Sequence, residues 1–323
     1  MIPTPICVII AARNAAETIG RAVASALQQP EVAEVLVVDD ASTDATGAAA
    51  TAADDGSGRL KLLRLAQNGG PSVARNRAIA ESSAPLIAIL DADDFLLPGR
   101  FAALAGAGLD LAADNMVFVS PERAATISPA DLPAFPEGFR PIDAASFVRA
   151  NISGKVRRGE LGFLKPILSR GFLDRHGLRY DETMWLGEDY DLYVRMLLRG
   201  ARFGLTRQVG YVAVERGGSL SGRHRTGDLV ALEAACRRHA ATPGLSPELR
   251  DAIDAHLRQV IRKRQLREFL DAKRASGLGG ALAYALSPPS RFLPIALGVA
   301  RDKLAALRPA PAAPKGDRLL LTE

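Results

Sequence analysis

Short apolar runs alternate with segments of helical spacing from residue 6 to residue 90, and this alternation constrains the fold more than any other feature. Each run is continuous and bounded by turn-forming residues, which is typical of a strand buried on both faces of a sheet. The runs are residues 6–11, 32–38, 60–65 and 86–90. Strands that alternate with helices form a mostly parallel sheet with helices on both faces. The sequence therefore predicts an α/β fold.

Polar side chains follow three of these runs at the point where the predicted strand ends. Arg13 and Asn14 follow the first run, Asp39 and Asp40 follow the second, and the acidic sequence DADD at 91–94 follows the fourth. In an open α/β sheet, ligands bind at the carboxyl ends of the strands. We therefore expect these polar groups to line a single crevice.

The acidic run at 91–94 admits two interpretations when it is considered alone. Clustered carboxylates repel one another unless a positive charge is near, and hard divalent cations prefer carboxylate oxygens. A site for a metal and a diphosphate would explain the cluster, and so would a solvated acidic turn. The chain has no G-x-G-x-x-G motif and no P-loop motif, so bound phosphates would be neutralised by a metal and by arginine.

Two predicted helix starts adjoin this crevice. Asn14 and Glu17 have the spacing of an N-cap residue and its reciprocal partner. A second helix, starting near Ser72, carries Arg75 close to its N-terminus, where the helix end and the guanidinium could stabilise an anion. The alternative for Arg75 is a surface position on an amphipathic helix.

A series of motifs runs through the first two thirds of the chain, in the order CVIIAARNAAETI, VVDDASTD, NGGPSVARNRAI, LDADDF and GEDYDLYVR. Together they resemble the family 2 glycosyltransferases of the GT-A fold, and within that family the bacterial exopolysaccharide enzymes of the succinoglycan type. The resemblance covers residues 6–221. It implies a mostly parallel central sheet with helices on both faces, to which this chain adds a helical C-terminal extension.

The resemblance also implies a role for each acidic group. Asp40 would contact the nucleotide base, and Asp91 and Asp93 would contact the ribose and a divalent metal, Mg²⁺ or Mn²⁺, on the diphosphate. Asp189, beside Glu188 at the start of a helix, would be the catalytic base. The other residues expected at the donor site are Ala11, Arg13, Asn14, Gly70, Arg75, Ala92, Lys165 and Arg223. For Lys165, contact with the acceptor or a phosphate and a plain surface position both stay open.

The role of Asp189 can also be considered on physical grounds. Inversion at an anomeric carbon needs a base that takes the proton of the attacking acceptor hydroxyl. A helix N-terminus lowers the pKa of an aspartate, whereas Glu188 and an apolar neighbour such as Trp185 raise it. The sequence leaves this balance open, and it also allows Glu188 and Asp189 to serve only as a favourable helix start.

These assignments predict an inverting glycosyltransferase that moves a sugar, with glucose from UDP-glucose as the first choice, to a hydroxyl group. The acceptor would be a growing exopolysaccharide or a lipid-linked oligosaccharide. Two alternatives stay open: a nucleotidyltransferase, and a non-catalytic protein that binds sugar nucleotides. The donor sugar, the acceptor, the linkage position and the oligomeric state cannot be read from the sequence.

The chain divides into three predicted regions. Residues 1–222 form the glycosyltransferase domain, residues 223–307 a helical region, and residues 308–323 a disordered tail rich in proline and alanine. A long helix is predicted at 247–274. For residues 278–307 two interpretations stay open, namely a helix packed on the main domain and an interfacial membrane helix.

Charge and hydropathy indicate which kinds of binding partner suit the chain. The formal net charge is +5, and the region after Arg223 is rich in arginine and lysine. Because aromatic residues are not interleaved with the basic ones, we do not expect nucleic-acid binding, whereas an anionic membrane surface suits this region. No run of about 18 apolar residues predicts a spanning helix, and residues 1–12 lack a signal-peptide pattern. We expect a cytoplasmic protein, peripheral at the inner face of the plasma membrane if its C-terminal region docks there.

Two cysteines, Cys7 and Cys236, lie far apart and match no metal-binding or redox spacing. Cys7 falls within an apolar run. We therefore expect a buried free thiol, which fits a reducing compartment.

Overall fold

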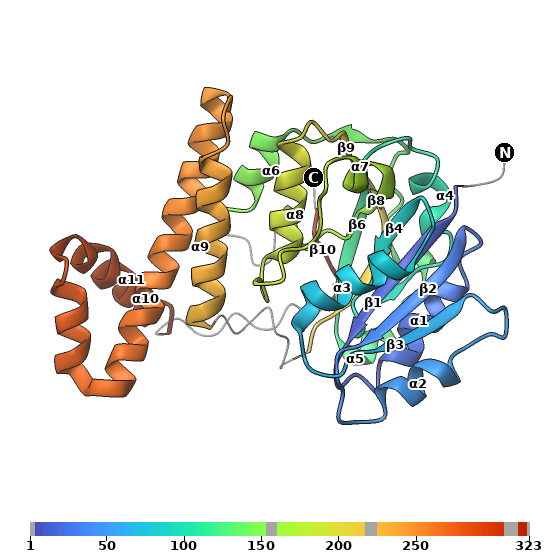
Figure 1. Ribbon diagram of the computed structural model, residues 1–323, viewed down its shortest axis with the longest axis horizontal. Helices are drawn as coiled ribbons and strands as arrows, with labels where there is room; N and C mark the ends of the chain where they lie inside the picture. Colours follow the sequence, from blue (N-terminus) through green and yellow to red (C-terminus); the bar gives the residue numbers. More distant parts are fainter. Residues whose placement is uncertain (1–3, 153–159, 217–224, 307–315, 322–323) are drawn as a thin grey trace. The chain divides into compact units, whose positions relative to one another are not determined.

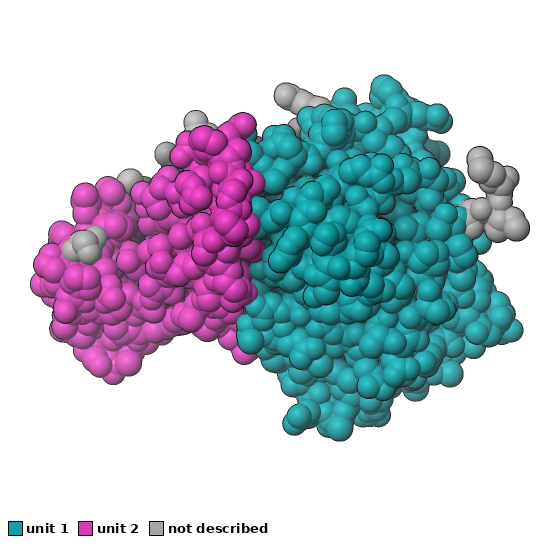
Figure 2. All heavy atoms as spheres, turned by 45° about the horizontal axis from the view of Figure 1, so that its top comes forward, with its two compact units in different colours: residues 1–217, 317–323 teal, residues 218–316 magenta. Residues whose placement is uncertain are grey.

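The computed structural model describes residues 4–152, 160–216, 225–306 and 316–321. It separates into two compact units (Figure 2). Unit 1 consists of Met1–Gly217 together with Asp317–Glu323, and unit 2 consists of Gly218–Gly316. The two units are described separately.

Unit 1 is built on a 10-stranded sheet whose main path runs β3-β2-β1-β4-β8-β6-β9-β5, with β10 beside β6 and β7 beside β9. The first four strands of this path are parallel, whereas β8 is antiparallel to both of its neighbours. The strands are β1 (Ile6–Ala12), β2 (Val32–Asp39), β3 (Leu60–Arg64), β4 (Leu86–Ile89), β5 (Phe95–Leu96), β6 (Leu111–Val119), β7 (Arg140–Pro141), β8 (Ile167–Ser169), β9 (Phe203–Val214) and β10 (Arg318–Leu319).

Helices cover this sheet (Figure 1), so the predicted α/β fold with a mostly parallel sheet is confirmed. The α-helices of unit 1 are α1 (Ile19–Leu27), α2 (Thr46–Ala52), α3 (Gly70–Glu81), α4 (Arg100–Leu104), α5 (Pro121–Ala124), α6 (Ala144–Ala150), α7 (Arg170–Arg175) and α8 (Glu188–Leu197). Two short 3₁₀ turns, η1 (Pro129–Asp131) and η2 (Leu161–Phe163), are also present. Every residue of β6 is buried, as expected for a strand covered on both faces.

Asn14 does not cap a helix, contrary to the prediction. Helix α1 begins at Ile19, and its N-cap residue is Thr18. Asn14 adopts a left-handed φ of 51°, and its Oδ1 accepts a hydrogen bond from the backbone N–H of Thr43 at 2.9 Å. Asn14 therefore joins the segments that follow β1 and β2 instead of capping a helix.

The apolar segments at 116–119 and 209–214 predict two further strands, and both strands are longer in the structure. The first is β6, which begins at Leu111, and the second is β9, which begins at Phe203. The two strands pair in parallel, and this pairing extends both of them beyond their most apolar residues. The segment 121–138 has several prolines and no clear period, which predicts a loop, but it contains α5 and η1.

Part of the predicted disordered tail is ordered. Residues 308–315 lie outside the described residues, but Arg318 and Leu319 form β10, which is antiparallel to β6. Leu320 is buried, and Leu319 packs against a core cluster that includes Val117. The burial of these apolar side chains stabilises the segment. The proline- and alanine-rich composition just before it gives no indication that it packs on the sheet.

Unit 2 consists of helices in its described part. They are α9 (Thr226–Ala240), α10 (Pro247–Leu286), the 3₁₀ turn η4 (Pro289–Arg291) and α11 (Phe292–Ala306). Ser246 caps α10 by accepting a hydrogen bond from the N–H of Leu249, and non-helical dihedral angles at Ser276 and Gly277 kink this helix. The helix predicted at 247–274 lies within α10. None of the helices in the described ranges combines the length and the apolar character needed to cross a bilayer.

Both cysteines are free and buried, as predicted for Cys7. Burial raises the pKa of the Cys7 thiol to about 12. This thiol is therefore uncharged at neutral pH and has the properties of a core residue rather than a nucleophile.

Candidate active site

The ends of three parallel strands meet at one edge of the sheet in unit 1. β1 lies between β2 and β4, and Ala12 of β1 is opposite Asp39 of β2. Beyond β4, the N–H of Leu90 donates to the carbonyl of Ile9 at 3.0 Å. The register therefore brings the polar groups after each strand to a common edge, as the sequence predicts.

Asp40, at the end of β2, anchors the start of α3. Its two carboxylate oxygens accept hydrogen bonds from the N–H groups of Gly69 at 2.7 Å and Gly70 at 2.8 Å. Gly70 has a φ of +84°, and a Cβ atom placed there would lie 3.0 Å from the ring of Trp185. Both the backbone angle and this contact favour glycine. Asp40 is buried. Its contact with a nucleotide base stays a prediction.

Arg75, one turn into α3, is the centre of a buried ion-pair network. Its Nη1 lies 2.6 Å from Oε1 of Glu188 and 3.2 Å from Oδ1 of Asp189, both at the start of α8. Its Nη2 lies 3.1 Å from Oδ1 of Asp91, just after β4. The side chain is only 5% exposed, so Arg75 is not the surface arginine of the alternative interpretation.

Lys165 is the second cation of this network. Its Nζ lies 2.9 Å from Oδ2 of Asp91 and 2.8 Å from Oδ2 of Asp189. Lys165 is buried, which excludes the plain surface position that the sequence left open. Arg75 and Lys165 therefore bridge the same two aspartates.

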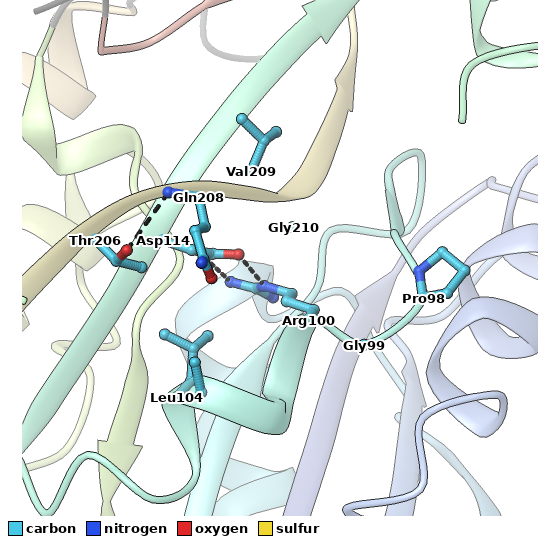
Figure 3. Close-up of a pocket in the computed structure, with 10 residues that line it drawn as sticks. Pro98, Gly99, Arg100, Leu104, Asp114, Thr206, Gln208, Val209 and Gly210 are labelled. Atoms are coloured by element: carbon cyan, nitrogen blue, oxygen red, sulfur yellow. Dashed lines mark hydrogen bonds and ion pairs between the residues drawn. The ribbon is translucent and has the colours of Figure 1, made fainter. Parts of the chain in front are cut away.

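A buried pair behind the network holds the backbone of Lys165. The guanidinium of Arg100 lies 2.8 Å from Asp114, and its Nη2 donates to the carbonyl of Lys165 at 2.6 Å. This pair borders a cavity of about 220 Å³ that is also lined by Thr206 and Gln208 (Figure 3). None of the residues of the ion-pair network lines that cavity.

The pKa values of two carboxyl groups in the network, those of Asp91 and Glu188, are shifted in opposite directions. Burial by itself would raise the pKa of Asp91, but Lys165 and Arg75 lower it below its ordinary value. Burial raises the pKa of Glu188 although Arg75 opposes the shift, and Asp189 adds to it. Asp91 therefore has an environment that favours the charged form, whereas that of Glu188 favours the neutral form.

Asp189 accepts a third hydrogen bond from a residue that no motif predicted. The hydroxyl of Tyr180 donates to Oδ1 of Asp189 at 3.1 Å, and the guanidinium of Arg75 lies over the Tyr180 ring at 5.3 Å. Burial, and then the charge of Asp189, raise the pKa of Tyr180 well above its ordinary value, so it remains a donor. The side chain of Asn76 fixes this segment by donating to the Tyr180 carbonyl at 2.9 Å.

Asp94 and Tyr211 form a second unpredicted contact. The Tyr211 hydroxyl donates to Oδ2 of Asp94 at 2.8 Å and accepts from the N–H of Asp91 at 3.1 Å. Asp94 also accepts from the N–H of Val214 at 2.8 Å. These bonds attach the acidic run to β9, so Asp94 has a structural role and Tyr211 positions Asp91. A tyrosine within an apolar strand carries no sequence signal for such a role.

Asp93 is the acidic residue of this run whose carboxylate has no partner among the described residues. Within the described ranges, its side chain makes no ion pair and no hydrogen bond to another residue. Burial and the neighbouring charge of Asp91 raise its pKa, which a bound cation would reverse. Both oxygens of Asp91, in contrast, already contact Arg75 and Lys165. Asp93 therefore fits a divalent cation, and Asp91 would have to release one of its cationic partners to join it.

The described residues contain no preformed metal cluster beside Asp93, since no three or more of their histidine, cysteine, aspartate or glutamate side chains form a group that could hold an ion. Substrate phosphates commonly complete the coordination of such cations. The coordination of a metal by Asp93 and Asp91 therefore stays a prediction.

Four of the remaining predicted donor residues lie around this edge. Ala11 is within β1, Ala92 is buried in the acidic run, and Arg13 is exposed after β1. Asn14 is exposed beside Arg13, although its amide oxygen is bonded to Thr43. Arg223 lies outside the described residues.

Comparisons with known proteins identify the family. A model described as Glycosyl transferase family 2 matches residues 7–127. Over 309 residues the chain is 51% identical to the succinoglycan biosynthesis protein ExoU of Rhizobium meliloti (strain 1021), and the match covers 95% of this chain and 90% of that protein. The chain is a family 2 glycosyltransferase of the succinoglycan type. The predicted family is therefore confirmed.

Further relatives agree with this family assignment. The succinoglycan biosynthesis protein ExoO of the same organism is 34% identical over 305 residues, covering 90% of the glycosyltransferase described here and 84% of ExoO. Among solved structures, S. aureus TarS 1–349 in complex with UDP-GlcNAc has a TM-score of 0.59 at 18% identity, covering 88% of this chain and 92% of TarS. The mannosyltransferase PcManGT from Pyrobaculum calidifontis, in complex with GDP-Man and Mn²⁺, has a TM-score of 0.56 at 19% identity, with 96% and 82% covered. These two structures establish the fold alone.

Proposed function

We propose that this glycosyltransferase moves a sugar, with inversion, from a UDP-sugar to a hydroxyl of a growing exopolysaccharide or a lipid-linked oligosaccharide. UDP-glucose is the donor we expect. The observation that carries the proposal is the double bridge in which Arg75 and Lys165 each contact both Asp91 and Asp189. A base and two phosphate-binding cations are thereby held within one buried cluster.

The donor diphosphate would compete with Asp91 and Asp189 for the two cations. Arg75 offers a planar guanidinium and Lys165 a compact ammonium, and both groups bind phosphate oxygens. When either cation turns towards a phosphate, an oxygen of Asp189 loses a hydrogen-bond donor and can accept a hydrogen bond from the acceptor hydroxyl instead. Binding of the nucleotide sugar would thus free Asp189 to act as the catalytic base.

Transfer would then follow as a single displacement. Asp189 takes the proton of the acceptor hydroxyl while that oxygen attacks the anomeric carbon. The bond from this carbon to the diphosphate breaks, and UDP departs with the electron pair, stabilised by Arg75 and Lys165. Glu188, held by Arg75 and with a raised pKa, would keep that guanidinium oriented.

A divalent cation, Mg²⁺ or Mn²⁺, would be held by Asp93, with Asp91 as its second ligand. When bound, it supplies positive charge that polarises the diphosphate and stabilises the leaving group. Relatives of the same fold support this choice, since PcManGT is described in complex with GDP-Man and Mn²⁺, and TarS with UDP-GlcNAc.

The membrane surface is the site at which we expect the acceptor. A lipid-linked oligosaccharide would be presented at the inner face of the plasma membrane, and the basic helical region at 223–307 would hold the enzyme there as a peripheral protein.

The decisive experiment for the class of reaction measures product identity. The purified chain is incubated with a panel of nucleotide sugars and Mn²⁺, and in a separate arm with UTP and glucose 1-phosphate. We expect UDP to be released from one nucleotide sugar in the presence of a saccharide acceptor. Pyrophosphate release in the second arm would instead identify a nucleotidyltransferase. Tight binding of nucleotide sugars with no turnover in either arm would support a non-catalytic sugar-nucleotide-binding protein.

A further inference from the structure

Exposed apolar side chains are concentrated in one part of unit 2. Nine large apolar side chains are exposed in the described ranges, and six of them lie between residues 278 and 297. We call these six the apolar face: Leu278, Leu282, Leu286, Phe292, Leu293 and Leu297. Leu278 and Leu293 are 66% and 65% exposed, which is unusual for leucine in a folded helix.

The apolar face is built by two helical segments with regular spacing. Leu278, Leu282 and Leu286 follow one another at four-residue intervals after the kink of α10, and Leu293 and Leu297 do so in α11. Residues at this spacing lie along one side of a helix. Each segment therefore presents a stripe of leucine side chains to its surroundings.

The inner sides of these segments are already packed within unit 2. Ala281, Ala285 and Ile295 are buried. Close approach is visible at Gly298 of α11, where an added Cβ atom would lie 3.1 Å from the side chain of Leu266 in α10. Because Ala281, Ala285 and Ile295 already fill the inside of this helical pair, its core does not need the leucines of the apolar face.

Basic residues flank the apolar face along the sequence. Between residues 273 and 303 the chain contains five basic residues and one acidic residue, Asp302. The basic residues are Lys273, Arg274, Arg291, Arg301 and Lys303. Apolar side chains bordered by cations suit a bilayer with anionic lipids, where the leucines enter the acyl boundary and the cations meet the headgroups. A second copy of the chain on this face would instead bring two positive sets together.

We propose that the apolar face is an interfacial anchor for an anionic phospholipid bilayer, lying in the membrane surface without crossing it. The inference makes the proposed function more specific, since it names the surface by which the enzyme would reach a lipid-linked acceptor. The lipid binding itself does not depend on sugar transfer.

Vesicle flotation with the full chain tests the anchor. Vesicles of phosphatidylcholine mixed with phosphatidylglycerol are compared with vesicles of phosphatidylcholine alone, for the wild type and for the triple variant Leu282→Gln, Leu293→Gln, Leu297→Gln. We expect the wild type to float with the anionic vesicles and the triple variant to lose binding about tenfold or more, because three inserted leucines are removed. The chain offers matched controls in Val230→Gln and Leu62→Gln, which remove exposed apolar side chains elsewhere and should bind like the wild type.

Several results would overturn the anchor. It is wrong if the triple variant floats like the wild type, if Val230→Gln or Leu62→Gln loses binding equally, or if neutral vesicles bind the wild type as well as anionic ones. It is also wrong if sedimentation velocity shows a dimer of the wild type that the triple variant abolishes, since the face would then be a contact between copies. UDP release from a soluble assay should be the same in the triple variant and the wild type. Vesicle binding without any sugar transfer would reject the proposed function and leave the anchor standing.

Discussion

In most proteins charged side chains are exposed and leucine side chains are buried. Unit 1 departs from this pattern with buried charges, and unit 2 departs from it with exposed leucines. Arg75, Lys165 and Asp189 are buried at the sheet edge, although charged side chains prefer water. Leu278 and Leu293 face outwards, although leucine prefers a core. Neither arrangement is what folding stability alone would select. These departures are the observations on which the two proposals rest, sugar transfer in unit 1 and bilayer binding in unit 2.

The two departures also differ in how they are compensated. In the ion-pair network of unit 1 each charged side chain contacts an opposite charge at 2.6–3.2 Å, so the buried charges are compensated as long as the network is complete. The apolar face of unit 2 needs no such partner, because an exposed leucine costs little in water. Removing one member of the ion-pair network should therefore destabilise the protein strongly, whereas removing one leucine of the apolar face should destabilise it little.

The largest effect is expected for Arg75→Met. The change leaves Asp91, Glu188 and Asp189 close together with Lys165 as their nearest cation, and breaking a buried ion pair costs about 3–5 kcal/mol. Urea unfolding measures the loss. Arg77→Met on the same helix is the control, since its pair with Glu81 is exposed and should add little to stability. Similar losses in the two variants would show that the network contributes no special stability.

A pH effect of intermediate size is expected in unit 2. Burial lowers the pKa of His256 to about 4 from 6.5, so the folded state disfavours its charged form. The resulting stability is complete above pH 6.5 and is lost as the pH falls towards 4, by about 3 kcal/mol at 1.36 kcal/mol per unit. Urea unfolding followed by helical circular dichroism at pH 7 and pH 4.5 measures the loss. In His256→Gln this part of the pH dependence should vanish, and an unchanged pH dependence would refute the assignment to His256.

A smaller effect is expected for Gly70→Ala. The residue has a φ of +84°, and the added methyl group would meet the Trp185 ring. The left-handed angle alone costs about 1–2 kcal/mol for a residue other than glycine. Gly99→Ala provides the control, because its φ is +76° with open space around it. Thermal unfolding should show a greater loss at Gly70 than at Gly99, and equal losses would mean that Trp185 adjusts freely.

Much of the sheet edge was predictable from the sequence, for a physical reason. Continuous apolar runs that stop at acidic residues locate strand ends, and parallel strands bring those ends together, so Asp91 and Arg75 could be assigned to one crevice. The family motifs added Asp189. Lys165 was expected near the site, but its contact with both Asp91 and Asp189 depends on the path of β8, a strand of three residues that has no distinct pattern.

Other features were not predictable because they depend on contacts between distant segments. Tyr180 lies in a segment without a motif, and only the folding of that segment onto α3 brings its hydroxyl to Asp189. Asn14 has the local pattern of a helix cap, yet its partner Thr43 is 29 residues away. β10 depends on apolar contacts with a strand about 200 residues earlier in the chain. Local patterns cannot report such pairings.

The most direct test of the account is the rate of sugar transfer by Asp189→Asn, measured in a single turnover with saturating nucleotide sugar. Asparagine keeps the shape of the side chain but cannot accept the acceptor's proton. Asp174→Asn, which alters an exposed pair with Arg179 in the same unit, is the control. We predict a fall of about 10²–10⁴-fold for Asp189→Asn, with nucleotide-sugar affinity close to that of the wild type and an unchanged rate for the control. A transfer rate for Asp189→Asn close to that of the wild type would contradict the assignment of the base and, with it, the proposed mechanism.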